Sequence, residues 1–171
     1  MDAPALPPAD LYINRELSML EFNKRVLAQA LDPDGPLLER LRFLCITCTN
    51  LDEFFEIRVA ALKQRIEIGA PAQGPEKRSA QQIFDSIRHT MLSVVQQQYE
   101  LLNQVLFPEM SRAGVVFLQS HEWNDEQQQW LQEYFLEQVV PVLTTLTFDP
   151  SRPFPRILNK SLNFIVRLRG K

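Results

Sequence analysis

The sequence has few of the residues from which metal, disulfide and nucleophilic sites are built. Its 171 residues include two cysteines and two histidines. Cys45 and Cys48 have the C-x-x-C spacing of a metal or redox pair, but neither a second pair nor a nearby histidine accompanies them. Because they lie in an apolar helical stretch, we expect buried free thiols. His89 and His121 lack a recognisable phosphate cradle, so we expect neither to be a catalytic nucleophile.

Long apolar runs and an excess of positive charge are also missing. No run approaches the ~20 apolar residues of a membrane-spanning helix, and no basic region followed by an apolar core opens the chain. We therefore expect a cytoplasmic protein. The net charge of -3 comes from 18 basic and 21 acidic residues, which argues against a general nucleic-acid binder because phosphate contacts need a surplus of Lys and Arg.

The chain does contain a succession of helical patterns with identifiable ends. Residues 1–10 are rich in Pro and Ala and predict a disordered lead. Ser18 and Glu21 have capping-box spacing, and an apolar stripe follows, which predicts a first helix over residues 18–31. The turn at residues 32–35 ends that helix, and Pro36 suits the first position of the next one.

The second and third helices are predicted to meet at a break. An apolar surface over residues 37–46 is broad enough to predict a helix buried on most sides. Asn50 and Glu53 have the spacing of another capping box, so Asn50 is expected to be the N-cap of a third helix that extends to about Ile68. Gly69 is placed as the C-cap of that helix.

The pattern after the loop at residues 70–78 changes from one long helix to mixed elements. Ser79 is expected to cap a helix of about thirty residues that ends at Gly114. Residues 115–118 predict a short strand, and Asn124 with Gln127 predicts a capped helix to about Val139. Residues 142–148 are β-rich, residues 149–155 predict a Pro-punctuated loop, and residues 161–168 alternate as a half-buried strand.

These elements predict a mainly α fold in two parts. An N-terminal helical bundle of about four helices, one of them long, occupies residues 11–114. Residues 115–171 form the opening β/α elements of an incomplete second domain, because the last strand has no partner in the sequence. At 45% hydrophobic, the chain is long enough for one core, or for one domain and part of another.

Three segments together resemble the polyphosphate kinase family in their order and spacing, and the likeness covers most of the chain from Leu11 onward. The segments are YINRELSMLEFN at residues 12–23, PLLERLRFL with TNLDEFFEIRVA at residues 36–60, and VPVLT with FDPSRPFP and LNKSLN at residues 140–163. The resemblance implies an N-terminal domain and the opening of a head domain, within an enzyme that moves the terminal phosphate of ATP to inorganic polyphosphate.

The resemblance also implies which parts of that enzyme are elsewhere. The family's phosphohistidine, its magnesium site and most of its ATP contacts lie in C-terminal domains, and nothing in this chain matches those motifs. We therefore expect this chain alone to be inactive. The family's enzymes are oligomers, and association of the complete enzyme with a membrane stays open.

One ATP contact of the family falls within this chain. The resemblance implies that the asparagine of the Asn-Leu-Asp-Glu-Phe motif, here Asn50, approaches ATP from the N-terminal domain. Residues 47–49, Thr-Cys-Thr, depart mildly from the small polar pair usual before it. From the residues alone, capping of a helix is the competing role for Asn50. Because Asp52 and Glu53 are negative, a base or sugar is a more suitable neighbour than a phosphate.

Basic residues on the second and third predicted helices are candidates for lining a channel that holds an anionic polymer. The competing interpretation is a set of solvated helix faces with ion pairs to Glu39 or Glu56. The same two interpretations apply to Arg152 and Arg156. An alternative function for the whole chain is a helical oligomerisation module with no ligand site of its own. The channel candidates are Arg40, Arg42, Arg58, Lys63 and Arg65.

Overall fold

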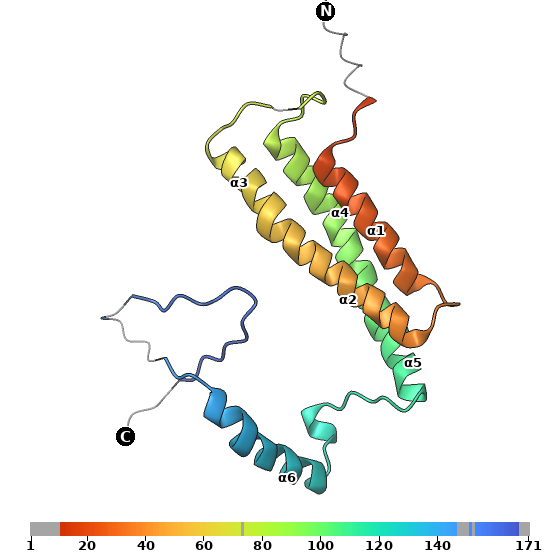
Figure 1. The fold of residues 1–171 in the computed structure, drawn as a ribbon, viewed down its shortest axis with the longest axis vertical. Coiled ribbons are helices and arrows are strands. Elements are labelled where there is room, and N and C mark those ends of the chain that lie inside the picture. The colour runs from red at the N-terminus through yellow and green to blue at the C-terminus, as the bar shows by residue number, and fades with distance from the viewer. Residues whose placement is uncertain (1–10, 73, 147–150, 152, 168–171) are drawn as a thin grey trace, which may run out of the picture. The chain divides into compact units, whose positions relative to one another are not determined.

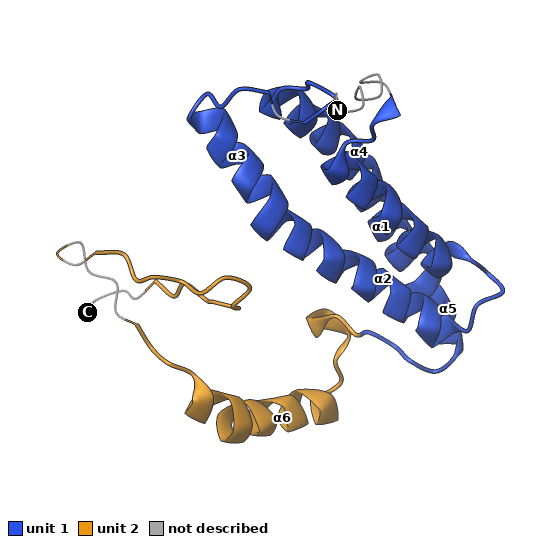
Figure 2. Ribbon diagram, turned by 45° about the horizontal axis from the view of Figure 1, so that its top comes forward, with its two compact units in different colours: residues 1–117 blue, residues 118–171 orange. Residues whose placement is uncertain are grey.

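The computed structural model describes residues 11–72, 74–146, 151 and 153–167. The chain divides into two compact units, residues 1–117 and residues 118–171, which Figure 2 colours separately. The lead at residues 1–10 lies outside the described residues. In chain order the elements are α1 Arg15–Leu31, α2 Leu37–Glu53, η2 Phe54–Val59, α3 Ala60–Glu67, α4 Ala80–Glu100, η3 Leu101–Leu106, α5 Phe107–Arg112, η4 Ser120–Glu122, α6 Asp125–Tyr134, η5 Phe135–Val139 and η6 Val140–Val142.

Unit 1 consists of three long helical rods that lie side by side (Figure 1). Helix α1 is the first rod, α2 with η2 and α3 is the second, and α4 with η3 and α5 is the third. Helix α1 packs against α2 and α4, and α3 packs against α4. The segments η2 and η3 are π-helical turns that continue the rods without a break. The mainly α fold predicted from the sequence is confirmed.

Helix α1 begins three residues earlier than the sequence predicted. Asn14 has extended backbone angles, and its side-chain oxygen accepts hydrogen bonds from the backbone N–H groups of Glu16 and Leu17 at 3.1 and 3.2 Å. Ser18 therefore lies inside the helix, and the prediction that it caps α1 is wrong. Asn14 is the more effective N-cap because its oxygen accepts hydrogen bonds from two of the N–H groups that have no partner within the helix.

The second rod shows that the predicted break at Asn50 does not exist. Helix α2 passes through Asn50 to Glu53 and continues into η2, so Asn50 is not an N-cap. No Pro or Gly interrupts residues 37–67, and the apolar stripe runs the whole length, so packing favours an unbroken helix over the local cap. The prediction that residues 37–46 are buried on most sides is also wrong, because Leu38 is 64% exposed.

The third rod follows the sequence prediction closely. Ser79 and Gln82 form a capping box at its start, and the rod then runs from Ala80 to Arg112. The second and third rods both end in a Schellman motif around a glycine with positive φ. At Gly69 the N–H of Ala70 donates to the carbonyl of Arg65, and Gly114 is placed in the same way. A side chain at either glycine would strain this backbone.

The core of unit 1 lies between the three rods. Apolar residues at three- and four-residue steps face one another. Burial of each large side chain stabilises the fold by about 1.5–3 kcal/mol. The predicted stripe of the third rod is confirmed from Ile83 to Gln98. The core consists of Leu20, Leu27, Ala30, Leu44, Leu51, Phe54, Val59, Leu62, Ala80, Ile83, Ile87, Met91, Val94, Leu101 and Leu106.

Unit 2 contains α6, capped as predicted by Asn124 with Gln127, and the short turns around it. The strand predicted at residues 115–118 is not formed: Val115 belongs to the Schellman motif, donating its N–H to Met110 at 2.9 Å. Residues 161–167 are likewise without strand structure, and residue 168 lies outside the described residues. A strand needs a partner for its backbone groups, and the described residues provide none.

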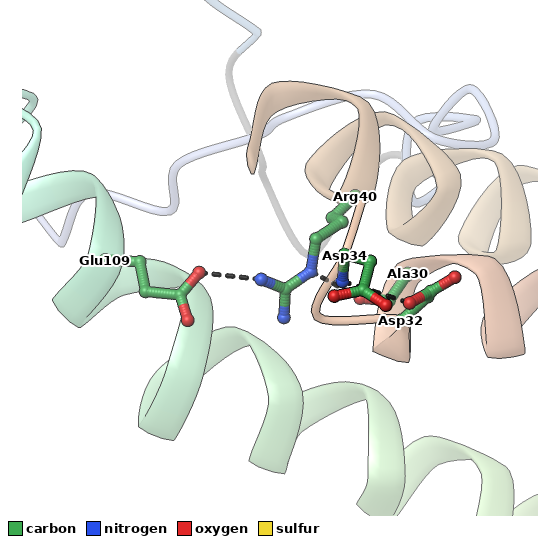
Figure 3. A network of polar contacts seen from close by, with 5 residues as sticks. All are labelled: Ala30, Asp32, Asp34, Arg40 and Glu109. Atoms are coloured by element: carbon green, nitrogen blue, oxygen red, sulfur yellow. Dashed lines mark hydrogen bonds and ion pairs between the residues drawn. The ribbon is translucent and has the colours of Figure 1, made fainter. Parts of the chain in front are cut away.

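One buried cation joins all three rods of unit 1. Arg40 is 5% exposed, and its Nε donates to the backbone carbonyl of Ala30 at 3.2 Å, near the end of α1. Its guanidinium also pairs with a carboxylate oxygen of Glu109, on α5, at 2.7 Å (Figure 3). Asp32 fixes the intervening turn by accepting the N–H of Asp34 at 3.0 Å. Arg40 therefore holds the α1–α2 turn against the third rod.

We expect Arg40→Met to lower the free energy of unfolding of the chain by about 3 kcal/mol. The substitution leaves Glu109 without its counter-ion, and the value falls at the lower end for broken buried pairs because Glu109 keeps partial access to water. Urea unfolding followed by circular dichroism measures the change. Arg42→Met is the matched control on the same helix, since the Arg42 side chain is 71% exposed, and a loss of under ~1 kcal/mol is expected there. Equal losses in both variants would contradict the role assigned to Arg40.

A second polar contact ties the loop before α4 to the start of α1. The Asn14 Nδ2 donates to the carboxylate of Glu76 at 2.8 Å while its oxygen caps α1. The pKa of Glu76 is lowered, first by a hydrogen bond from its own backbone N–H and then by the bond from Asn14. A lowered pKa means that the ionised carboxylate is favoured in the folded chain.

We expect Asn14→Ala to raise the pKa of Glu76 part of the way toward its ordinary value, because the backbone bond remains. The contribution of this contact to stability is present above the pKa of the unfolded chain and is lost as pH falls through the lower folded pKa. The pH dependence of the Glu76 carboxyl carbon signal, measured by NMR, checks the shift. An unchanged midpoint in Asn14→Ala would show that the contact does not form in solution.

Candidate functional site

The polar residue on which the sequence resemblance centres lies at a contact between the first two rods. Asn50 is half-buried in the last turns of α2, and its Nδ2 donates to the side-chain oxygen of Asn23 at 3.1 Å. Asn23 lies in the middle of α1, is 4% exposed, and donates its own Nδ2 to the backbone carbonyl of Thr47 at 3.2 Å. The three residues form one hydrogen-bonded chain across the α1–α2 interface.

Helix α2 keeps these groups in place because its own turns are internally bonded. Thr47 is fully buried, and its hydroxyl donates to the carbonyl of Phe43 at 2.8 Å. The hydroxyl of Thr49 donates to the carbonyl of Cys45 at 3.1 Å. Threonines that bond back to the preceding turn do not compete for the Asn50 amide. Asn50 does not cap a helix, and its side chain is held on one side by the hydrogen bond to Asn23.

Sequence reasoning missed Asn23. It stands one position after Phe22 in the motif quoted for residues 12–23, and it falls on the buried face of α1 between Leu20 and Leu27. This position could have identified Asn23 from the sequence, because a buried Asn on an apolar helical face requires a polar partner. The partner lies on another helix, which the spacing of one helix does not reveal.

The basic candidates do not form one uniform group. Arg40 is buried and satisfied by Ala30 and Glu109, so the structure gives it a structural role. Arg42 is exposed beside Glu39, at 3.6 Å, which is the ion pair that the sequence left as an alternative. Arg58 and Lys63 are exposed on η2 and α3.

Arg65 differs again from the other basic residues. It is half-buried near the end of α3, and its guanidinium donates to the carbonyl of Pro71 at 3.5 Å. Its Nε is buried and has no hydrogen-bond partner among the described residues. Arg156, in unit 2, is exposed, and Arg152 lies outside the described residues.

The two cysteines are exposed, so the prediction of buried thiols is wrong. They lie on α2 beside the buried stripe rather than within it. The Cys48 Sγ nevertheless accepts a hydrogen bond at 3.4 Å from the buried side chain of Gln98, on α4. Partial desolvation at this boundary is the main cause that raises the pKa of Cys48, with smaller contributions from Cys45 and Asp52. A raised pKa leaves the thiol protonated and weakly nucleophilic near neutral pH.

We expect the Cys45→Ser variant, which retains Cys48, to react with iodoacetamide with a pH midpoint above that of N-acetylcysteine amide, a blocked cysteine without a free carboxylate, under the same conditions. Desolvation, the largest cause of the raised pKa, remains in this variant. Mass spectrometry of the alkylated chain across a pH series gives the midpoint. A midpoint at or below that of the free thiol would contradict the raised pKa and would reopen a reactive role.

Other features add no second polar site among the described residues. His89 and His121 are exposed. No group of three or more His, Cys, Asp or Glu side chains is placed to hold a metal ion in the part of the chain that is described. No helix there is both long and apolar enough to cross a bilayer. Unit 2 has an open hollow of about 730 Å³ lined by Ser120, Trp123, Gln128, Leu131, Gln132, Tyr134, Phe135 and Val139.

Comparison with known proteins identifies the class of domain and then the family. Residues 12–118 match the sequence profile described as the polyphosphate kinase N-terminal domain, and residues 126–171 match the polyphosphate kinase middle domain. The helical unit that carries Asn23 and Asn50 is therefore a domain of this type. The chain belongs to the polyphosphate kinase family.

Individual relatives agree with this assignment. The chain is 50% identical to polyphosphate kinase from Burkholderia cenocepacia over 159 residues, which are 93% of this chain and 23% of that protein. It is 51% identical to the one from Xylella fastidiosa over 160 residues, 94% of this chain and 23% of that protein. The crystal structure of polyphosphate kinase from Porphyromonas gingivalis matches with a TM-score of 0.65 and 25% identity, covering 80% of this chain and 19% of that one. The chain thus spans about a quarter of the length of the curated relatives.

Proposed function

We propose that this chain serves as the N-terminal, nucleotide-side part of an enzyme that reversibly transfers the terminal phosphate of ATP to inorganic polyphosphate. Family membership supports this role, and we propose that the phosphohistidine lies outside this chain. Phosphoryl transfer depends on positioning and on charge neutralisation, so a domain contributes to it without carrying the nucleophile. We place the complete enzyme in the cytoplasm as a homo-oligomer.

Within this enzyme, Asn50 is proposed to contact the adenosine end of ATP. The observation that carries this proposal is the hydrogen bond from Asn50 to Asn23, which fixes a half-buried amide by one edge. An amide fixed in this way keeps a carbonyl oxygen and a second N–H with which to meet a base edge or a ribose hydroxyl.

The charges next to Asn50 favour adenosine over the phosphates at this point. Asp52 and Glu53 follow Asn50 along α2, and their negative charges repel a polyanion. Asn50 also lies inside a continuous helix, so no free helix N-terminus is present to attract a phosphate. The phosphates and Mg²⁺ are accordingly assigned to other parts of the enzyme, and no step that involves the metal is assigned to this chain.

A role in holding polyphosphate is proposed for the exposed basic residues of the second rod. Arg42, Arg58 and Lys63 are exposed, and Arg65 is half-buried on the same rod. Exposed cations on one helical rod attract an anionic polymer, and the attraction weakens as salt rises. Arg40 is left out because Glu109 already neutralises it.

We expect ATP to shift the amide signals around Asn50 in a titration of this chain followed by NMR, and Asn50→Ala to weaken binding about fivefold. That factor corresponds to the loss of one hydrogen bond worth ~1 kcal/mol. Gln81→Ala is the control, since Gln81 is an exposed amide in the first turn of α4 and bonds only to Asp85 among the described residues. Polyphosphate in place of ATP should shift the signals of Arg42, Arg58 and Lys63.

The same titration distinguishes the alternative of a helical interaction module. An exposed apolar stripe on α4 favours that alternative, with Leu92 at 66%, Val95 at 38% and Tyr99 at 62% exposure. The module alone predicts no shift with ATP at several millimolar, where even ~4 kcal/mol of binding would be seen. Shifts confined to the α4 stripe as the protein concentration rises would support self-association instead of a nucleotide site.

A further inference from the structure

We propose that Asn23 is a positioning residue that fixes which end of the Asn50 amide faces a ligand, and thereby selects a purine with a 6-amino group over one with a 6-oxo group. This inference rests on the proposed function, because it names the part of ATP that Asn50 reads. It adds a residue on α1, which makes the nucleotide specificity a property of the α1–α2 interface rather than of one motif.

The polarity of the amide pair follows from a backbone carbonyl. The carbonyl oxygen of Thr47 can only accept, so the Asn23 atom 3.2 Å away must be the Nδ2 donor. The other end of the Asn23 amide is then an oxygen, which can only accept. Asn50 lies 3.1 Å from that oxygen and must present its own Nδ2. Each assignment forces the next, which leaves one consistent arrangement of both amides.

Burial makes the reversed arrangement costly. If the Asn23 amide turned over, its oxygen would face the Thr47 carbonyl, and two acceptors would meet without a proton between them. Asn23 is 4% exposed, so water cannot replace the lost hydrogen bond. Asn50 is half-buried and would turn freely if Asn23 did not hold it. The buried residue therefore sets the orientation of the accessible one.

The free edge of Asn50 has a defined chemistry as a result. Its carbonyl oxygen accepts no hydrogen bond from the described residues, and only one of its two N–H groups is used by Asn23. An acceptor beside a donor complements adenine, whose amino group lies beside a ring nitrogen acceptor. Hypoxanthine has an oxygen in place of that amino group, so it would set two acceptors against each other.

The positioning itself is tested without any nucleotide, by hydrogen exchange of the Asn50 side-chain amide in NMR spectra. We expect one of its two protons to exchange several-fold more slowly than those of Asn103, an exposed asparagine of the third rod. In Asn23→Ala this protection should disappear. Asn14→Ala is the matched control: it removes another buried, hydrogen-bonded asparagine, the N-cap of α1, about 13 Å away along the helix axis. Exchange of both wild-type protons at the Asn103 rate overturns the proposal even if Asn23→Ala does not fold.

The selection is tested by comparing ATP with inosine triphosphate in titrations of the same chain. We expect the unmodified chain and Asn14→Ala to bind ATP about tenfold more tightly, and Asn23→Ala to bind the two with nearly equal affinity. A ratio that Asn23→Ala leaves unchanged overturns the inference while the nucleotide site stands. If the chain binds neither ATP nor inosine triphosphate, the nucleotide site proposed at Asn50 in this chain is overturned together with the selection, whereas the exchange experiment still decides whether Asn23 positions Asn50.

Discussion

The architecture of unit 1 depends on the buried guanidinium of Arg40. A charge 5% exposed must be neutralised and hydrogen-bonded, or it would destabilise the fold by several kcal/mol. Its two partners lie on different rods, Ala30 on α1 and Glu109 on α5. Apolar packing alone lets helices slide and rotate with small changes in energy, whereas this pair is satisfied in one arrangement only. The turn between α1 and α2 is thereby fixed, and with it the register that brings Asn23 opposite Asn50.

Local rules predicted well the features that one segment determines. The capping boxes at Ser79 and Asn124, the glycine end at Gly69 and the long stripe of the third rod all depend on residues a few positions apart. Features that depend on another rod were predicted poorly. Asn50 has good capping chemistry and good capping spacing, but one of its amide N–H groups donates to Asn23 on α1, and continuous packing carries the helix past it. Residues 115–118 similarly have strand propensity but form no strand, because the described residues provide no partner strand.

The candidate site shows the same division between local and distant information. The sequence resemblance indicated Asn50, and the structure shows what holds it. The buried amide of Asn23, on α1, accepts a hydrogen bond from Asn50 and is itself held by the backbone carbonyl of Thr47, on α2. The basic residues looked alike in the sequence, yet Arg40 is a structural ion-pair partner and Arg42 is a solvated one, with side chains 6% and 71% exposed. Burial, which separates them, is a property of the assembled rods.

The π-helical turns have a consequence for how this domain tolerates changes in length. Each of η2 and η3 contains a wider turn than an α-helix, which takes up an additional residue without ending the rod. Deleting one residue there would let the turn tighten into an ordinary α-helix and keep both flanking stripes facing the core. The same deletion within α4 would rotate everything after it by about 100° and turn buried side chains outward. Alignment gaps of one residue among related domains should therefore collect at η2 and η3.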